Sequence, residues 1–411
     1  MKKDLDIHNY QKQTEHAIQR LENATDITKK NRNLIFEFRD HMSLNGISIP
    51  RILRYLWILK DWAKLVQVDF DKATKEDIMK AVRIIQDDSH YKPWTKSTYK
   101  AMLKCFYKWL KKTEGHPAEV SWIKARPKRT EQELMNNSDL FTEEDIKKLI
   151  NLADHPRDKA LVSVLYESGA RIGEIASLQI GNLKFDEYGV ILNVIGKTGA
   201  RHIRIITSTP YLMTWIQNHP FRNDSKAPLW INIGTPNHHS VIKYWTIRAM
   251  LERLFKRADI KKRFNPHMFR HSRATFLADH LTEFQMNQYF GWIQGSNMPS
   301  TYVHMSGKEI DSSILALNGL KTKEQHKEVT LKPKICSRCD TINAVDAKFC
   351  SKCAGILDMQ TAYELQEKTM KEKEIRKNSD DVLNTLMRDP EFVAVFVNKV
   401  KELGLAEKMH F

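Results

Sequence analysis

The sequence predicts a mainly α-helical protein with one small antiparallel β-sheet, an α+β class, divided into several units. Apolar residues recur every three to four positions through most of the chain, as the buried faces of amphipathic helices do. Two apolar runs, 190–195 and 202–206, flank a turn that contains glycine, and this pattern predicts a β-hairpin. The length of 411 residues exceeds one ordinary domain and suits two or three.

The first unit expected is a helical bundle over residues 26–115, preceded by a polar N-terminal tail at residues 1–25. Its third helix should begin at Thr74, an N-cap residue followed three positions later by Asp77. Between the apolar positions of its fourth helix stand Lys96, Lys100, Lys104, Lys108, Lys111 and Lys112. On an isolated helix such a run indicates a solvated face, and the alternative here is a surface that binds a polyanion.

A basic, extended linker is expected at residues 116–138, and a second unit of mixed helices and strands at 139–325. Within this unit a helix should end at Gly169, since glycine readily takes the left-handed conformation that follows a helix. Lys197 lies in the turn of the predicted β-hairpin. A small cysteine module at 333–357 and a helical tail at 359–411 complete the expected organisation, with Pro390 at the start of the last helix.

Composition favours a nucleic-acid partner. The formal net charge is +16, while 41% hydrophobic and 28% charged residues are a normal globular mixture. We find no stretch of about 20 apolar residues, and the N-terminal residues lack the apolar core of a secretory signal. We therefore expect no membrane association and a cytoplasmic location.

The second unit carries a scattered set of polar residues that suits chemistry on a phosphate. In chain order they are Arg171, Lys197, His267, Arg270, Trp292 and Tyr302. His267 and Arg270 are three positions apart, which places them on one face of a helix. Each member alone has a plainer explanation, because surface arginines, turn lysines and packed tyrosines are common. The ordered set is far more specific than any member.

Cleavage of a DNA backbone bond needs a nucleophile, neutralisation of charge on the phosphate oxygens, and a proton for the leaving 5′ oxygen. Arginine binds phosphate with two parallel hydrogen bonds and stays charged. Positive neighbours can stabilise a tyrosine phenolate despite its usual pKa of about 10. A lysine at a hairpin tip can supply the proton as general acid. Tyr302 is thus the candidate nucleophile and Lys197 the candidate acid.

The same residues resemble the tyrosine recombinase (phage integrase) family. The segments that carry the resemblance are 169–175, 196–199, 266–275, 290–292 and 300–304. The resemblance implies that Arg171, His267 and Arg270 bind the scissile phosphate, and that Lys197 is the general acid. It also implies that Trp292 positions the phosphate or supports the tyrosine, and that Tyr302 forms a 3′-phosphotyrosine. Glu174 would support the residues that bind the phosphate without contacting it.

Four features need separate interpretation. Ser272-Arg273 replaces the family's more usual threonine-phenylalanine, and the Trp292 indole, with one donor and no basic site, cannot transfer protons. His271 is interpreted as a core or supporting histidine rather than a direct catalytic group. Tyr289 is a conceivable rival nucleophile, although in the family its position belongs to helix packing.

The cysteine module has the spacing of a structural zinc site. Cys336, Cys339, Cys350 and Cys353 form two Cys-x-x-Cys pairs, a pattern that resembles a zinc ribbon. Four thiolates would fill the coordination of Zn²⁺, so we expect a structural ion and no cofactor for catalysis. DNA contact and protein contact are equally open as roles of this module. The remaining Cys105 is expected to be a small buried hydrophobe.

The resulting hypothesis is a site-specific recombinase or integrase that acts on double-stranded DNA. The resemblance implies four protomers on two DNA sites, and we expect a monomer in solution. Two alternatives stay open: a type IB topoisomerase-like activity, and a DNA-binding regulator that has no catalytic activity. A metal nuclease that uses His267 and His271 is less favoured, because acidic ligands are missing nearby.

Overall fold

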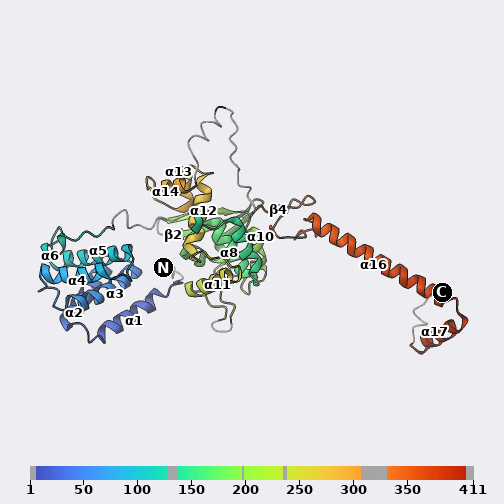
Figure 1. The fold of residues 1–411 in the computed structure, drawn as a ribbon, viewed down its shortest axis with the longest axis horizontal. Helices are drawn as coiled ribbons and strands as arrows, with labels where there is room; N and C mark the ends of the chain where they lie inside the picture. The colour runs from blue at the N-terminus through green and yellow to red at the C-terminus, as the bar shows by residue number, and fades with distance from the viewer. Residues whose placement is uncertain are drawn as a thin grey trace.

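The computed structural model describes residues 6–127, 137–196, 199–234, 238–306, 318 and 331–403. A helical bundle, a mixed domain, a small cysteine module and a long helical arm follow one another along the molecule (Figure 1). Helices dominate and the sheets are small and antiparallel, so the predicted α+β class is confirmed. Within the described ranges, none of the helices combines the length and apolar character that crossing a membrane requires.

The N-terminal bundle packs around its own hydrophobic core, in which Trp62, Phe70 and Phe106 are fully buried. Thr74 caps its helix as predicted, because its hydroxyl accepts a hydrogen bond from the Asp77 N–H and the Asp77 carboxylate accepts one from the Thr74 N–H. The helices are α1 (Tyr10–Glu22), α2 (Lys29–Leu44), α3 (Ile49–Val66), α4 (Lys75–Asp87), α5 (Pro93–Leu110) and α6 (Ala118–Ser121).

The N-terminal segment differs from the expected polar tail. Residues 10–22 form α1, which packs along α3 and buries Ala17 and Leu21. Residues 6–8 reach the mixed domain instead, where the Ile7 side chain is buried and its carbonyl accepts a hydrogen bond of 3.0 Å from the Tyr244 N–H. The apolar stripe of α1 is narrow among polar residues, and this is why the periodicity did not reveal it.

The mixed domain surrounds a larger core that is centred on α8. The predicted hairpin is present as β2 and β3, which pair antiparallel with Gly196 opposite Gly199, and β1 adds a third strand beside β2. Its elements are α7 (Glu143–Leu152), α8 (Pro156–Ser168), α9 (Ile172–Ala176), β1 (Leu183–Asp186), β2 (Gly189–Gly196), β3 (Gly199–Ile205), α10 (Thr209–Gln217), α11 (Tyr244–Arg257), α12 (Pro266–Ala278), α13 (Glu283–Phe290) and α14 (Met298–Ser306), with short 3₁₀ turns at Asn137–Asp139 and Ile180–Asn182.

A second, smaller core lies on the other face of α12, where α12, α13 and α14 meet. Its buried hydrophobic residues are Ala274, Leu277, Ala278, Met286, Phe290 and Tyr302. The mixed domain therefore has two cores joined by one helix, and the candidate tyrosine belongs to the smaller one.

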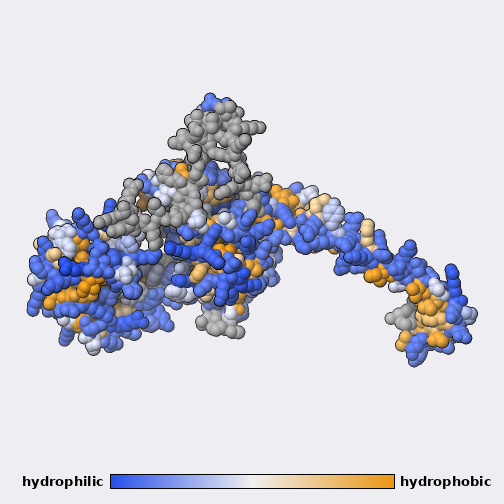
Figure 2. Space-filling model, viewed as in Figure 1, coloured by the Kyte–Doolittle hydropathy of each residue, from blue (hydrophilic) through white to orange (hydrophobic). Residues whose placement is uncertain are grey.

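The cysteine module holds the short strands β4 (Lys334–Ile335) and β5 (Ile342–Asn343), and the Tyr211 hydroxyl of α10 donates a hydrogen bond of 2.7 Å to Asp346 of the module. Beyond it, α16 (Met359–Leu386) extends away from the body and leads to α17 (Pro390–Glu402) (Figure 1). Pro390 begins α17 as predicted, capped by Asp389. Apolar surface gathers at α17 at the end of this arm (Figure 2).

Candidate functional site

Arg171 is aimed by the rigid turn that ends α8. Gly169 takes the left-handed conformation, with φ of 53°, and Arg171 then caps α9. The Glu174 carboxylate accepts a hydrogen bond of 2.8 Å from the Arg171 backbone N–H and one of 3.1 Å from its guanidinium. One third of the Arg171 side chain stays exposed, so the guanidinium keeps donors free for another group.

Arg201 is a member of the site that the sequence analysis missed. Both of its terminal nitrogens donate hydrogen bonds of 2.8 Å to Glu174, and its Nε donates one of 2.9 Å to the Tyr289 carbonyl. Burial raises the pKa of Glu174, but the hydrogen bonds and charges of Arg201 and Arg171 together outweigh it and lower this pKa below its usual value. Glu174 therefore stays ionised between two arginines and ties β3 to α9.

Gly196 stands at the base of the hairpin turn, against the Glu174 carboxylate. A Cβ atom at this position would collide with Glu174 Oε1, so only glycine lets the strand pass so close to the ion pair. The neighbouring Lys197 lies outside the described residues. The structure therefore describes the two ends of the hairpin turn, Gly196 and Gly199, and how that turn is anchored.

His267 and Arg270 lie in the first turns of α12, which is capped by Asn265. Arg270 is buried and donates to the carbonyls of Gly169 at 3.0 Å and Phe290 at 2.7 Å. Burial, followed by the charge of Arg171, lowers the pKa of Arg270 to about 10. Burial and the two arginines also lower the pKa of His267. Two guanidinium groups thus lie close enough to repel each other in a partly buried region, an arrangement that favours an incoming anion.

Tyr302 lies inside this cluster rather than on a remote face. Its side chain is only 2% exposed, and its ring stacks on Trp292 with centroids 5.4 Å apart and planes 2° apart. The Arg270 guanidinium lies 5.3 Å from the centroid of the Trp292 ring, so Trp292 contacts both the cation and the tyrosine ring. Burial raises the pKa of Tyr302, and the charge of Arg270 acts in the opposite direction.

His271 makes the hydrogen bond to the tyrosine hydroxyl, with 2.7 Å between its Nδ1 and the Tyr302 oxygen. Tyr289, the conceivable rival nucleophile, is turned away, because its hydroxyl donates to the Glu167 carbonyl at 3.1 Å. Ser272 and Arg273 have packing contacts: the Ser272 hydroxyl accepts from the Phe141 N–H, and the Arg273 guanidinium lies over the Tyr166 and Phe276 rings.

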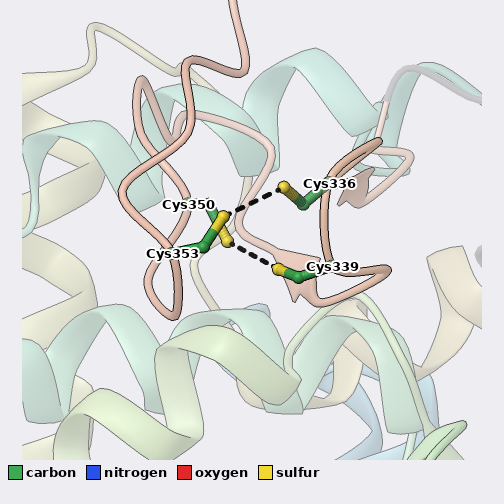
Figure 3. Close-up of side chains that lie close together, drawn as sticks. All are labelled: Cys336, Cys339, Cys350 and Cys353. Atoms are coloured by element: carbon green, nitrogen blue, oxygen red, sulfur yellow. Dashed lines mark hydrogen bonds between the residues drawn. The ribbon is translucent and has the colours of Figure 1, made fainter.

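The four cysteines of the module converge from two loops (Figure 3). Their sulfur atoms all lie within 4.8 Å of one another, with 3.5 Å between Cys336 and Cys353 and between Cys339 and Cys350. A tetrahedral zinc site with Zn–S bonds of about 2.3 Å separates its sulfurs by about 3.8 Å. The backbone N–H of Cys353 lowers the pKa of Cys350 to about 6 and so favours the thiolate that a metal binds. The geometry and the donors therefore fit a metal ion.

Comparison with known proteins relates part of the chain to one family. Residues 139–309 match the model of the phage integrase family. The tyrosine recombinase XerA of Pyrococcus horikoshii is 23% identical over 276 residues, which cover 67% of this chain and 89% of the relative.

Two solved structures share the fold. The XerH site-specific recombinase, in a post-cleavage complex with its difH substrate, has a TM-score of 0.53 at 14% identity and covers 77% of this chain and 98% of its own. The lambda integrase tetramer bound to a Holliday junction has a TM-score of 0.51 at 14% identity and covers 68% of this chain and 78% of its own. The sequence motifs, the fold and these matches together show that residues 139–309 of this chain form a phage integrase family domain.

Proposed function

We propose that this protein is a site-specific recombinase that cleaves and rejoins DNA strands through a 3′-phosphotyrosine intermediate. One observation carries the proposal: the Tyr302 hydroxyl is buried within the same cluster as Arg270, His267 and Trp292. A phenol beside fixed cations is the combination that attack on a phosphodiester requires.

Each residue of the cluster has a proposed part. Arg171, Arg270 and His267 bind the non-bridging oxygens of the scissile phosphate, and Tyr302 attacks phosphorus. Lys197 protonates the leaving 5′ oxygen, a role that rests on its place in the hairpin turn. Glu174 fixes Arg171, and Trp292 holds the tyrosine ring by stacking. The covalent intermediate conserves the energy of the broken bond, so rejoining needs no further cofactor.

The proposed substrate is double-stranded DNA, which the bundle and the mixed domain would grip together in the cytoplasm. The charge of +16 and the difH complex of XerH support it. Three lysines of the α5 run, Lys96, Lys104 and Lys111, donate to carbonyl oxygens inside the bundle. The exposed Lys108 and Lys112 are therefore better candidates for contacts with phosphate.

The proposed assembly is a monomer in solution and a tetramer on two DNA sites, for which the lambda integrase tetramer on a Holliday junction is the precedent. Sedimentation of the free protein, and then of the protein with a synthetic junction, tests both halves of this proposal.

The proposed metal of the cysteine module is a structural Zn²⁺. Cys350→Ser should release the metal and unfold the module, and metal analysis of the purified protein measures it. Cys105→Ser is the matched control, since Cys105 lies on α5 and outside the cluster, where it is exposed rather than buried as predicted. Equal zinc content in the wild type and Cys350→Ser would contradict the assignment.

A suicide substrate, nicked so that the freed end diffuses away, tests the main proposal. The wild type should form a covalent protein–DNA adduct at Tyr302, located by mass mapping, and Tyr302→Phe should form none while it still binds DNA. Tyr289→Phe is the control and should form the adduct. Supercoil relaxation without exchange between sites would indicate a topoisomerase, and binding without any adduct would indicate a regulator.

A further inference from the structure

His271 is the side chain in direct contact with the proposed nucleophile. The imidazole projects from α12, one residue after Arg270, and Tyr302 reaches it from α14. Only 2.7 Å separates His271 Nδ1 from the tyrosine oxygen, and the Tyr302 ring is held from its face by Trp292. The Tyr302 ring is therefore held by packing, with its hydroxyl already in contact with His271, before any substrate arrives.

The direction of this hydrogen bond follows from the charges around it. Burial, followed by His267 and Arg270, lowers the pKa of His271 to about 4, so the imidazole is neutral near pH 7. Burial raises the pKa of Tyr302, so the phenol keeps its proton. The tyrosine O–H therefore donates to Nδ1, and the proton of the neutral ring lies on Nε2.

We propose that His271 is a catalytic base: its Nδ1 takes the Tyr302 proton as the tyrosine attacks the DNA. This inference rests on the proposed function and assigns His271 a chemical role, whereas the sequence suggested only support. A base must lie within hydrogen-bond reach of the proton that it removes, and among the described contacts of the Tyr302 hydroxyl the His271 nitrogen meets this condition.

The step balances as follows. The Tyr302 O–H bond breaks and its proton passes to His271 Nδ1, while the phenolate oxygen forms a bond to phosphorus. The bond from phosphorus to the 5′ oxygen breaks, and that oxygen takes a proton from Lys197. In the rejoining step a 5′ hydroxyl gives its proton to Lys197 and bonds to phosphorus. The bond from phosphorus to the tyrosine oxygen breaks, and the departing phenolate recovers its proton from His271.

The positive charge around His271 makes its basicity depend on whether DNA is bound. Among the described residues, the charged or titratable groups that act on His271 are His267 and Arg270 from its own helix and Tyr302 from α14. In the absence of DNA the positive charge makes the imidazole a weak base. A phosphate bound by Arg171 and Arg270 would offset that charge, strengthen the base and so couple activation of the tyrosine to occupancy of the site.

A substrate with sulfur in place of the leaving 5′ oxygen separates the two proton transfers, because a thiolate leaves without protonation. His271→Gln retains an acceptor for the Tyr302 hydroxyl but cannot take its proton. We expect it to slow adduct formation about 100-fold or more on both substrates. Lys197→Ala should be slow on the oxygen substrate and recover on the sulfur substrate.

Three results would overturn the assignment. A wild-type rate in His271→Gln would make the contact a positioning contact. Recovery of His271→Gln on the sulfur substrate would move its role to the leaving group. A rate in His271→Ala that is far lower than in His271→Gln would also indicate positioning alone.

The controls keep this test distinct from the test of the proposed function. His280→Gln replaces an exposed histidine next to the end of α12 and should react like the wild type. DNA binding and thermal unfolding of each variant identify any that fail to fold. If the wild type forms no adduct, the proposed function fails; if the wild type and His271→Gln form it equally fast, only the base assignment fails.

Discussion

The two halves of the site rest on hydrophobic cores of different size. Arg171 caps α9 and Glu174 lies within it, beside Ile175 and Ala176 of the large core, and Arg201 of β3 pairs with Glu174. Tyr302 belongs instead to the small core between α12, α13 and α14. Arg270 joins the halves, since it donates to Gly169 on one side and Phe290 on the other.

This contrast indicates that the two halves of the site have different tasks. The half proposed to bind the phosphate is fixed by the bidentate ion pair of Arg201 with Glu174 and by deep packing, so it can stabilise charge without reorganisation. The half that carries the nucleophile depends on few buried residues, and its placement is therefore the easier to change. The following predictions test whether the two halves can be perturbed separately.

Arg171→Ala should give the largest effect. Loss of one fixed donor from such an anion site costs on the order of 100- to 1000-fold in rate. DNA affinity should change much less, because many phosphate contacts share it. Adduct formation at saturating DNA and a binding titration measure the two quantities. The control is Arg204→Ala, an exposed arginine paired with Asp186. A larger loss of affinity than of rate would make Arg171 a binding residue only.

Gly196→Ala should give the next largest effect, because it displaces side chains of the site without removing any of them. The added methyl group would push Glu174 away and disturb both arginines that it holds. A displacement of about 1 Å in a reacting site costs about 100-fold in rate. The same adduct assay measures the loss, and Gly115→Ala, which has open space around it, is the control. Full activity in Gly196→Ala would show that the ion pairs of Glu174 with Arg171 and Arg201 do not position the site.

The sequence predicted the parts of this comparison that depend on local pattern. The turn at Gly169, the hairpin ended by Gly196 and Gly199, and the helix that carries His267 and Arg270 follow from propensity and periodicity. The pairing of Arg201 with Glu174 joins residues 27 positions apart, and the Tyr244–Ile7 contact joins the start of α11 to the chain's N-terminal segment. Local periodicity contains no information about such pairings.

Met286→Ala should show that the two cores unfold separately. Met286 is fully buried in the small core, and a Met→Ala change of this kind costs about 2–5 kcal/mol. The loss should be confined to α13 and α14, so hydrogen exchange should rise there while DNA binding is retained and adduct formation falls on warming. Leu165→Ala, in the large core, should instead lower the unfolding temperature of the whole mixed domain. Identical behaviour of the two variants would mean that the domain has one cooperative core.

The smallest effect expected is a dependence of stability on pH. It arises from His267 and His271 on α12, the helix that joins the two cores. The folded protein lowers the pKa of His267 and lowers that of His271 to about 4, whereas an unfolded histidine titrates near 6.5. Below pH of about 6.5 the unfolded chain thus binds more protons, so the free energy of unfolding must fall as the pH drops toward 4. His271→Gln should reduce this slope between pH 7 and 5, where carboxylates contribute less, and His280→Gln should leave it unchanged. Thermal unfolding at several pH values measures the slopes. An unchanged slope in His271→Gln would mean that its imidazole is protonated as readily in the folded chain as in water, and the cationic surroundings on which the comparison rests would then be absent.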